Sequence, residues 1–254
     1  MVSESMVVKV VLVRHGESEW NKENRFTGWT DVDLTKKGRE EAKKAGLLLT
    51  KNGFSFDVLH ASRLLRSANT LTIIRDTMHS QAPVYHTWRL NERHYGALQG
   101  MQKKEAASLY GQEQVDLWRR SWNVSPPAVS YRDPRWPGND AHYIDLRHDE
   151  LPLAESLEEC TARTLPYWYD VIVPQLAVGK HPLVVASGNS LRAVVKMLDK
   201  VSDEDIKDVN IPTGIPLVYE LDEKNSFLPI KKYYLGDKEE LRKKEEAVKN
   251  QSRA

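Results

Sequence analysis

Residues 7–17 read VVKVVLVRHGE, an aliphatic and largely β-branched run that ends at Arg14 and His15. A run that is apolar on both of its alternating faces predicts a strand buried on both sides, as in the parallel sheets of α/β proteins. A second run of this kind, PLVVA at residues 182–186, is followed by SGNS at 187–190 and by a helical pattern. The sequence therefore predicts two buried strands that both end in polar residues.

Helical and strand patterns alternate along the rest of the chain. Helical patterns cover residues 35–49, 63–77, 104–118, 156–173 and 190–200, and shorter strand patterns cover 56–60, 83–85, 216–221 and 230–235. Thr35 is a typical N-cap, and Ser156 with Glu159 fits a capping box. This order predicts a right-handed, three-layer, doubly wound α/β sandwich with a mostly parallel central sheet. Ligands of such folds bind beyond the carboxyl ends of the strands.

We expect residues 1–254 to form a single domain with two unusual segments. Residues 121–153 are rich in proline and contain Trp122, Tyr131, Trp136 and Tyr143, which predicts an ordered excursion over the face of the domain rather than a linker. The tail at residues 237–254 is highly charged, which is typical of a solvated helix with a frayed end.

The composition limits the classes of partner. The 254 residues carry 37 basic and 36 acidic side chains, a net charge of +1, which argues against general nucleic-acid binding. The single cysteine, Cys160, excludes an intrachain disulfide and suits a reducing compartment. The apolar run at 7–13 is too short to span a membrane. No histidine spacing suggests a metal site. We expect a cytoplasmic protein with no membrane partner.

The two strand ends carry the candidate chemistry. A lone histidine at a strand end is more often structural than catalytic, but His15 has an arginine before it and a glycine after it. Arginine offers a planar fork of donors that matches a phosphate, and glycine lets the main chain approach a ligand closely. A neutral imidazole is a good nucleophile for phosphorus near pH 7. A phosphate-handling site at these strand ends is the interpretation that we favour.

Five strings of sequence carry a resemblance to a known family: RHGESEWN at 14–21, NRFTGW at 24–29, WRLNERHYG at 88–96, WRRS at 118–121 and NIPTGIP at 210–216. The first resembles the signature of the histidine phosphatase superfamily. Together the strings, which extend over almost the whole chain, resemble the cofactor-dependent phosphoglycerate mutases. The resemblance implies interconversion of 3- and 2-phosphoglycerate through a phosphorylated histidine. It also implies 2,3-bisphosphoglycerate as priming phosphoryl donor, no metal, and a homodimer or homotetramer.

The resemblance also implies roles for individual residues. The catalytic residues would be His15 as phosphoacceptor, Arg14 and Arg66 as the grip on the phosphoryl group, and Glu92 as general acid and base. The substrate-binding residues would be Asn21, Thr27, Gly28, Arg93, Tyr95, Lys103, Arg119, Arg120, Gly188 and Asn189. Two of these roles have simpler alternatives, because Arg66 could be an ordinary surface residue of a helix and Glu92 could form a salt bridge with Arg89 or Arg93. In the family the C-terminal tail covers the mouth of the site.

One position departs from the family. Residues 186–190 read Ala-Ser-Gly-Asn-Ser, whereas the family has Ala-His-Gly-Asn-Ser, so Ser187 replaces a second histidine that is thought to neutralise the phosphoryl group in flight. Loss of such a donor costs on the order of 10²–10³ in rate. His181 lies at the wrong end of its strand to compensate, and we expect a partly buried structural role for His60.

This departure leaves three functions open. The first is a phosphoglycerate mutase. The second is a weakly active or non-catalytic relative that binds phosphoglycerates or a protein partner. The third is a slow bisphosphoglycerate phosphatase, because water can hydrolyse a phosphohistidine.

Overall fold

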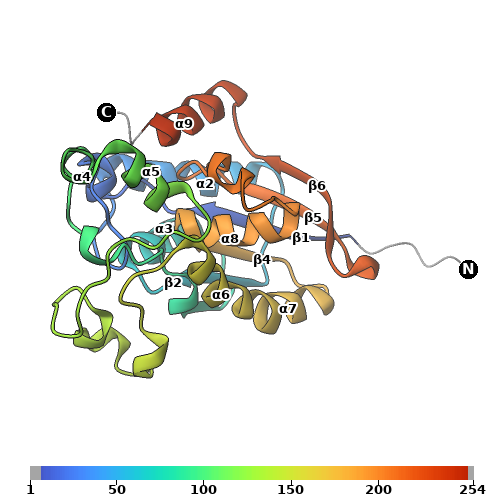
Figure 1. Cartoon of the computed structure of the whole chain (residues 1–254). Coiled ribbons are helices and arrows are strands. Elements are labelled where there is room, and N and C mark those ends of the chain that lie inside the picture. The colour runs from blue at the N-terminus through green and yellow to red at the C-terminus, as the bar shows by residue number, and fades with distance from the viewer. Residues whose placement is uncertain (1–6, 251–254) are drawn as a thin grey trace, which may run out of the picture.

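The computed structural model describes residues 7–250, and within that range six strands form one sheet in the order β3-β2-β4-β1-β5-β6 (Figure 1). The strands are β1 (Val7–Arg14), β2 (Val58–Ser62), β3 (Val84–Thr87), β4 (Pro182–Ala186), β5 (Leu217–Asp222) and β6 (Leu228–Tyr234). The pairs β1–β4, β2–β4 and β2–β3 are parallel, which confirms the mostly parallel sheet. The last two strands pair antiparallel, a detail that the patterns did not predict.

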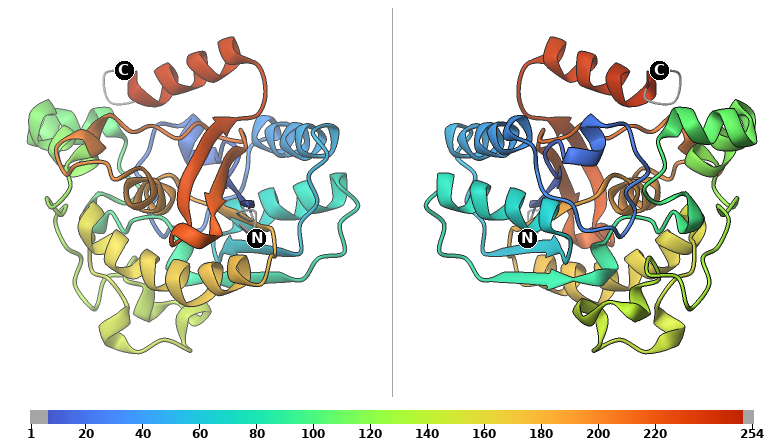
Figure 2. Two further views of the ribbon diagram at one scale, coloured as in Figure 1. Left: turned by 90° about the vertical axis from the view of Figure 1, so that its right-hand side faces the viewer. Right: turned by 90° about the vertical axis from the view of Figure 1, so that its left-hand side faces the viewer.

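Helices cover both faces of this sheet, as the two views of Figure 2 show. The helices are α1 (Glu19–Lys22), α2 (Lys36–Lys51), α3 (Leu65–Thr77), α4 (Lys103–Tyr110), α5 (Gln112–Arg120), α6 (Leu157–Tyr167), α7 (Val173–Ala177), α8 (Gly188–Asp199) and α9 (Lys238–Asn250). Leu49 of α2 and Ile74 of α3 pack on one face with Val13 of β1. Leu191 of α8 and Leu176 of α7 pack on the other with Leu12. The three-layer α/β sandwich is confirmed.

Two of the predicted helices are interrupted. The helix expected over 104–118 divides at Gly111, whose φ of 85° no ordinary helical residue adopts. The helix expected over 156–173 begins with the predicted capping box of Ser156 and Glu159, but it widens into a π-helical turn at Trp168–Ile172. In that turn the N–H of Val173 donates to the carbonyl of Trp168, five residues back. The next residue, Pro174, has no N–H with which to continue the usual ladder.

Residues 121–153 lie over one end of the sandwich without a long helix or strand. They form the 3₁₀ turns Pro137–Asn139, Ala141–Tyr143 and His148–Glu150. Trp136 and Tyr143 are buried in a small aromatic cluster with Trp29 and Trp88 of other loops. The segment therefore has its own apolar packing, which orders it in the absence of regular backbone structure.

The C-terminal helix α9 lies across the loops at the carboxyl end of the sheet (Figure 1). The ammonium of Lys244 donates to Glu41 of α2 and to the carbonyl of Thr213, both at 2.9 Å. Residues 251–254 of the predicted tail lie outside the described part of the chain. No helix within residues 7–250 is long and apolar enough to cross a bilayer.

The carboxyl ends of β1 and β4 lie side by side at the centre of the sheet. Arg14 pairs with Ala186, and the N–H of His15 donates to the carbonyl of Ala186 at 3.0 Å. After His15 the chain turns onto the start of α2, and two glycines permit the contact. A Cβ atom at Gly16 would lie 2.2 Å from the carbonyl oxygen of Gly38, and one at Gly38 would lie 2.0 Å from that of Glu17. The position of the loop after β1 therefore depends on these glycines.

Replacement of Gly38 by alanine tests this packing. Gly38→Ala should lower the free energy of unfolding by about 1–3 kcal/mol, because the added methyl group forces two main chains apart. Urea denaturation measures the change, with Lys43→Ala on the exposed side of the same helix as control. Equal stability of Gly38→Ala and the wild type would contradict the tight contact.

Candidate active site

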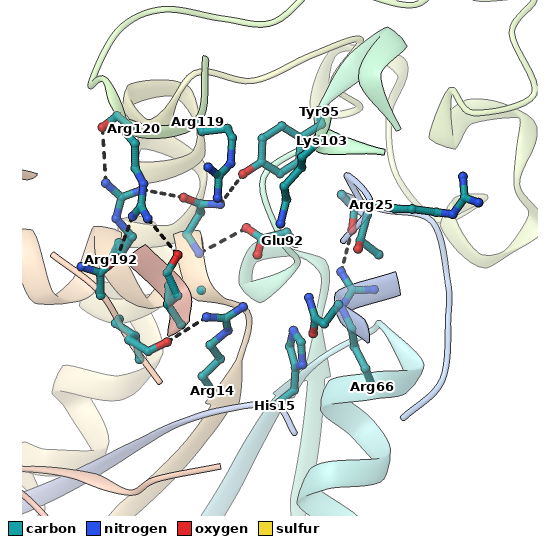
Figure 3. A pocket seen from close by; sticks show the side chains of 18 of the residues that line it. Arg14, His15, Arg25, Arg66, Glu92, Tyr95, Lys103, Arg119, Arg120 and Arg192 are labelled. Atoms are coloured by element: carbon teal, nitrogen blue, oxygen red, sulfur yellow. Dashed lines mark hydrogen bonds between the residues drawn. The ribbon is translucent and has the colours of Figure 1, made fainter. Parts of the chain in front are cut away.

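A pocket opens beyond the carboxyl ends of β1 and β4, where the fold class places its ligands (Figure 3). All of the predicted site residues except Arg93 line it: Arg14, His15, Asn21, Thr27, Gly28, Arg66, Glu92, Tyr95, Lys103, Arg119, Arg120, Gly188 and Asn189. They come from β1 and the residue after it, from α1 and the loop before α2, from α3, from the loop after β3, from α4 and α5, and from the start of α8. The fold thus brings together residues that are far apart in the sequence.

His15 follows the last residue of β1 and is almost fully buried. Its Nδ1 lies 2.7 Å from the carbonyl oxygen of Gly16. A carbonyl can only accept, so Nδ1 carries the proton and Nε2 keeps its lone pair. Burial, and next the charges of Arg66 and Arg14, hold the pKa of His15 well below its ordinary 6.5, although the bond to Gly16 opposes them. The imidazole is therefore neutral at pH 7 and has a fixed tautomer.

Arg14 and Arg66 lie on either side of His15 (Figure 3). Arg14 donates to the carbonyl of Ile211 at 2.9 Å. Arg66 donates to the carbonyls of Thr30 at 3.0 Å and Gly28 at 2.7 Å. Arg66 is 1% exposed, so its interpretation as an ordinary surface residue is wrong. Main-chain carbonyls thus fix both guanidinium groups next to the imidazole.

Glu92 lies across the pocket from this group. Its Oε1 accepts from the N–H of Arg93 at 2.7 Å and from the N–H of Asn189 at 3.2 Å. Among residues 7–250 these are the only hydrogen bonds of the carboxylate, so Oε2 is left without one. Neither the Arg89 nor the Arg93 side chain forms an ion pair with Glu92 in the described part of the chain, and Arg89 is instead 3.9 Å from Glu150. The alternative role of Glu92 in a salt bridge is therefore wrong.

The remaining wall of the pocket is positively charged. Burial lowers the pKa of Lys103 well below its ordinary 10.5, and the neighbouring Arg119, Arg14 and Arg120 lower it further. Burial also lowers the pKa of Arg119 to about 10. Within the described residues, Nε of Arg14 and Nη1 of Arg119 are buried and have no hydrogen-bond acceptor. A bound anion would relieve the repulsion and supply acceptors.

Arg93 does not line the pocket. Its guanidinium donates to the hydroxyl of Tyr95 at 3.1 Å and to the carbonyl of Arg119 at 2.9 Å, so it supports the wall from behind. The pocket also contains residues that the sequence analysis did not select: Arg25, Arg192, Val209, Asn210, Ile211 and Val248. Asn210 and Ile211 lie in a string that carried the family resemblance, and Arg192 is one helical turn after Asn189. Nothing in the local sequence marked Val248.

Ser187, the position that departs from the family, lies beside His15 because it follows Ala186 in the parallel pairing of β1 and β4. Its side chain is fully buried and, among the described residues, its hydroxyl has no hydrogen-bond partner. It occupies the N-cap position of α8 without making the capping bond, and it does not belong to the pocket lining. No charge stands here in place of the missing imidazole.

Neither His60 nor His181 compensates for Ser187. His60 lies in the middle of β2, not at its end, and its ring nitrogens lie 2.7 Å from the Tyr167 hydroxyl and 2.8 Å from Gln175 Oε1. Burial lowers the pKa of His60 to about 4, so it is a neutral structural residue. His181 precedes β4 at the opposite end of the sheet. Residues 7–250 contain no group of three or more histidine, cysteine, aspartate or glutamate side chains that could hold a metal ion.

Comparison with known proteins identifies the class. The family model of the histidine phosphatase superfamily (branch 1) matches residues 10–228. The chain therefore belongs to the histidine phosphatase superfamily. It is 53% identical over 249 residues to the 2,3-bisphosphoglycerate-dependent phosphoglycerate mutase of Hamiltonella defensa, covering 98% of this chain and 99% of that protein. Within the superfamily the chain thus belongs with the 2,3-bisphosphoglycerate-dependent phosphoglycerate mutases, as the sequence strings predicted.

Solved structures of lower identity share the fold. The mycobacterial glucosyl-3-phosphoglycerate phosphatase superposes with a TM-score of 0.66 at 19% identity, over 90% of this chain and 97% of that one. YhfR of Bacillus stearothermophilus superposes with a TM-score of 0.65 at 21% identity, over 85% and 92%. At these identities the likeness concerns the fold alone.

The pKa of His15 provides a test of the site's electrostatics. Arg66→Met should raise the pKa of His15 towards 6.5, because it removes one of the two positive charges that lower it. Titration of ¹⁵N-labelled histidine side chains by NMR measures the shift, with the His15 signal assigned from its loss in His15→Gln. Arg25→Met is the control, since Arg25 lines the pocket but is not among the groups that lower this pKa. An unchanged His15 titration in Arg66→Met would contradict the assignment.

Proposed function

We propose that this protein interconverts 3-phosphoglycerate and 2-phosphoglycerate by phosphoryl transfer through His15, with 2,3-bisphosphoglycerate as the priming donor. The observation that carries the proposal is the neutral imidazole of His15 between the guanidinium groups of Arg14 and Arg66, with no hydrogen bond to Nε2 in the described part of the chain. The 53% identity to a 2,3-bisphosphoglycerate-dependent phosphoglycerate mutase supports it. Phosphoryl transfer needs mainly positioning and charge neutralisation, and this arrangement supplies both.

The pocket fits a small molecule with several negative charges. Arg14, Arg119 and Arg192, which line it, each have a buried N–H group without a hydrogen-bond partner among residues 7–250. When bound, the primer supplies the phosphoryl group that charges His15. In our proposal Arg14 and Arg66 hold that group, and Lys103, Arg119 and Arg120 hold the carboxylate and the distal phosphate. Asn21, Thr27, Gly28, Tyr95, Gly188 and Asn189 complete the lining.

The first step is attack by Nε2 of His15 on the phosphorus atom. The lone pair of Nε2 is available because Nδ1 donates its proton to the carbonyl of Gly16. As the P–O bond breaks, the positive charges of Arg14 and Arg66 offset the negative charge on the phosphoryl oxygens. These groups are already in place through their bonds to main-chain carbonyls, so little reorganisation accompanies the transfer.

Glu92 moves the proton that the transfer requires. The substrate oxygen that loses the phosphoryl group must gain a proton, and the oxygen that later receives it must lose one. Two main-chain N–H groups hold Oε1, so Oε2 is the oxygen that can exchange the proton with substrate. A single carboxylate beside two neighbouring hydroxyls serves both directions of the reaction.

The tail closes the site in this proposal. Val248 of α9 lines the pocket, and its carbonyl accepts from Arg120 at 3.2 Å. Exclusion of water protects the phosphohistidine from hydrolysis and favours transfer back to the glycerate. By family we also propose a cytoplasmic, single-domain protein that forms a homodimer or homotetramer.

Ser187 supports a second candidate function. Its hydroxyl is uncharged, buried and outside the pocket lining. During transfer the phosphoryl group therefore lacks the contact that the second histidine of the family provides. A weakly active or non-catalytic relative, which binds phosphoglycerates or a protein partner, would keep the anion-binding pocket but have little or no mutase turnover. A slow bisphosphoglycerate phosphatase would still phosphorylate His15, but water would take the phosphoryl group in place of the glycerate.

Phosphorylation of His15 and mutase turnover, measured together, distinguish these functions. We expect the wild type, incubated with ³²P-labelled 2,3-bisphosphoglycerate, to form phosphorylated His15 and to interconvert the two phosphoglycerates. Ser187→His should raise the turnover on the order of 10²-fold, because it restores a donor at the phosphoryl group. Mass spectrometry locates the label, and a coupled assay measures turnover.

The controls are His15→Ala, which should abolish labelling, and His60→Gln, which should change neither quantity. Turnover near zero in the wild type with recovery in Ser187→His would favour the non-catalytic relative. Release of inorganic phosphate faster than mutase turnover would favour the phosphatase. No label on His15 in either the wild type or Ser187→His would overturn the proposed function.

A further inference from the structure

A buried ion pair lies directly behind Glu92. Arg163 of α6 donates from Nε to Oε1 of Glu155 at 2.6 Å and from Nη2 to Oε2 at 2.9 Å. Arg163 is 7% exposed and Glu155 is 4% exposed. Burial by itself lowers the pKa of Arg163, but the carboxylate of Glu155 outweighs it and raises that pKa above its ordinary value. Arg163 is therefore a permanent cation in the interior, and neither residue lines the pocket.

The rest of the Arg163 guanidinium binds the main chain that leads to Glu92. Nη1 donates to the carbonyls of Trp88 at 3.1 Å, Arg89 at 3.0 Å and Asn91 at 3.2 Å. Nη2 donates to the carbonyl of Glu92 itself at 3.2 Å. These carbonyls belong to the 3₁₀ turn Trp88–Leu90, in which the carbonyl of Trp88 also accepts from the N–H of Asn91, and to the irregular residues after it.

Glu155 holds the chain on the other side of Glu92. Its Oε2 accepts from the N–H of His94 at 2.8 Å, and its own N–H donates to the carbonyl of His94 at 2.8 Å. The ring faces of Trp29 and Trp88 enclose the guanidinium of Arg163 at 5.4 and 6.0 Å. The pair thus fixes the backbone from Trp88 to His94, at whose centre Glu92 lies.

We propose that Arg163 and Glu155 act as a positioning pair for Glu92, holding its main chain so that the carboxylate can reach the substrate oxygen. The proposal rests on the proposed function of Glu92 as the proton-transfer group. A buried ion pair is costly to form, and hydrophobic side chains of similar volume would fill the same space. Here the two side chains bind five main-chain groups of a segment that consists of one short 3₁₀ turn and irregular residues.

Two phosphoryl donors whose leaving groups differ in their need for a proton distinguish a role in positioning Glu92 from a general role in stabilising the fold. In the first step the P–O bond of the donor breaks, an N–P bond forms at His15, and a glycerate alkoxide takes a proton from Glu92. p-Nitrophenyl phosphate undergoes the same exchange of bonds at His15, but it releases p-nitrophenolate, which is stable without a proton near neutral pH. Transfer from this donor therefore depends little on where Glu92 lies.

Arg163→Lys and Glu155→Gln test the proposal. Lysine keeps the charge, but its ammonium group lacks the planar set of donors with which a guanidinium binds a carboxylate in bidentate fashion and several carbonyls at once. The rate of His15 phosphorylation by 2,3-bisphosphoglycerate, measured in single turnover, should fall about 10–100-fold in each variant, the range seen when residues that orient a reacting group are lost. The burst of p-nitrophenolate from p-nitrophenyl phosphate should fall less than about threefold in the same proteins, because the fork does not touch His15, Arg14 or Arg66.

Two further comparisons fix the interpretation. In a Glu92→Gln background Arg163→Lys should slow bisphosphoglycerate transfer little further, because the group that it positions is already gone. Arg63→Lys is the matched control. Arg63 also forms a forked pair, with Asp145 at 2.7 and 2.6 Å, but within residues 7–250 its guanidinium has no hydrogen bond to residues 88–94, and its bond to Asn91 comes from the main-chain N–H, which the substitution keeps. It should leave both donor rates unchanged. If Arg163→Lys fails to fold, as both donor rates and circular dichroism would show, Glu155→Gln carries the test.

The possible failures are distinguishable. A parallel fall of both donor rates in a folded Glu155→Gln protein, or full additivity of Arg163→Lys with Glu92→Gln, would overturn the positioning role and leave the proposed function intact. A wild type that transfers no phosphoryl group from either donor would overturn the proposed function and the positioning role with it.

Discussion

The concentration of buried positive charge around His15 is the constraint on which the site depends. Arg14, Arg66, Lys103 and Arg119 surround one carboxylate, Glu92, and burial lowers the pKa of each of these cations. Cations in so confined a space repel one another and lose hydration, so the fold must hold them there. Burial and the same repulsion keep His15 neutral, and the repulsion favours a ligand with several negative charges. The buried cations thus influence both the protonation state of His15 and the class of ligand that the pocket favours.

Main-chain carbonyls hold three of the buried guanidinium groups, those of Arg14, Arg66 and Arg163. The carbonyls of Ile211, Thr30 and Gly28 bind Arg14 and Arg66, and those of Trp88, Arg89, Asn91 and Glu92 bind Arg163. Carbonyls within helices and strands are already engaged, whereas those of loops need partners when they are buried. Pairing buried guanidinium groups with buried loop carbonyls satisfies both at once. The sheet places the two strand ends, and this pairing gives the loops above them a fixed shape.

Ser187 contributes no side-chain hydrogen bond to the site among the described residues. The main-chain bonds around it do not involve its side chain, because the carbonyl of Ala186 accepts from the N–H of His15 and the N–H of Asn189 donates to Glu92. The cationic groups and the fixed tautomer do not depend on the side chain at this position. The pocket therefore has its other charged groups in place, although the side chain at position 187 carries no charge.

The sequence by itself determined the strands at residues 7–14 and 182–186, the α/β class, the family, and most residues of the pocket wall. The strands and the fold class follow from residue type and hydrophobic periodicity, which are local properties of the sequence. The family and the residues of the pocket wall follow from sequence motifs that are long enough to identify relatives. Only the tertiary structure decided that β5 and β6 pair antiparallel, and that Arg93 lies behind the wall while Arg192 and Val248 line it. It also decided that His60 is bound to Tyr167 and Gln175. Burial and contact depend on which distant segments the fold brings together, and no local pattern contains that information.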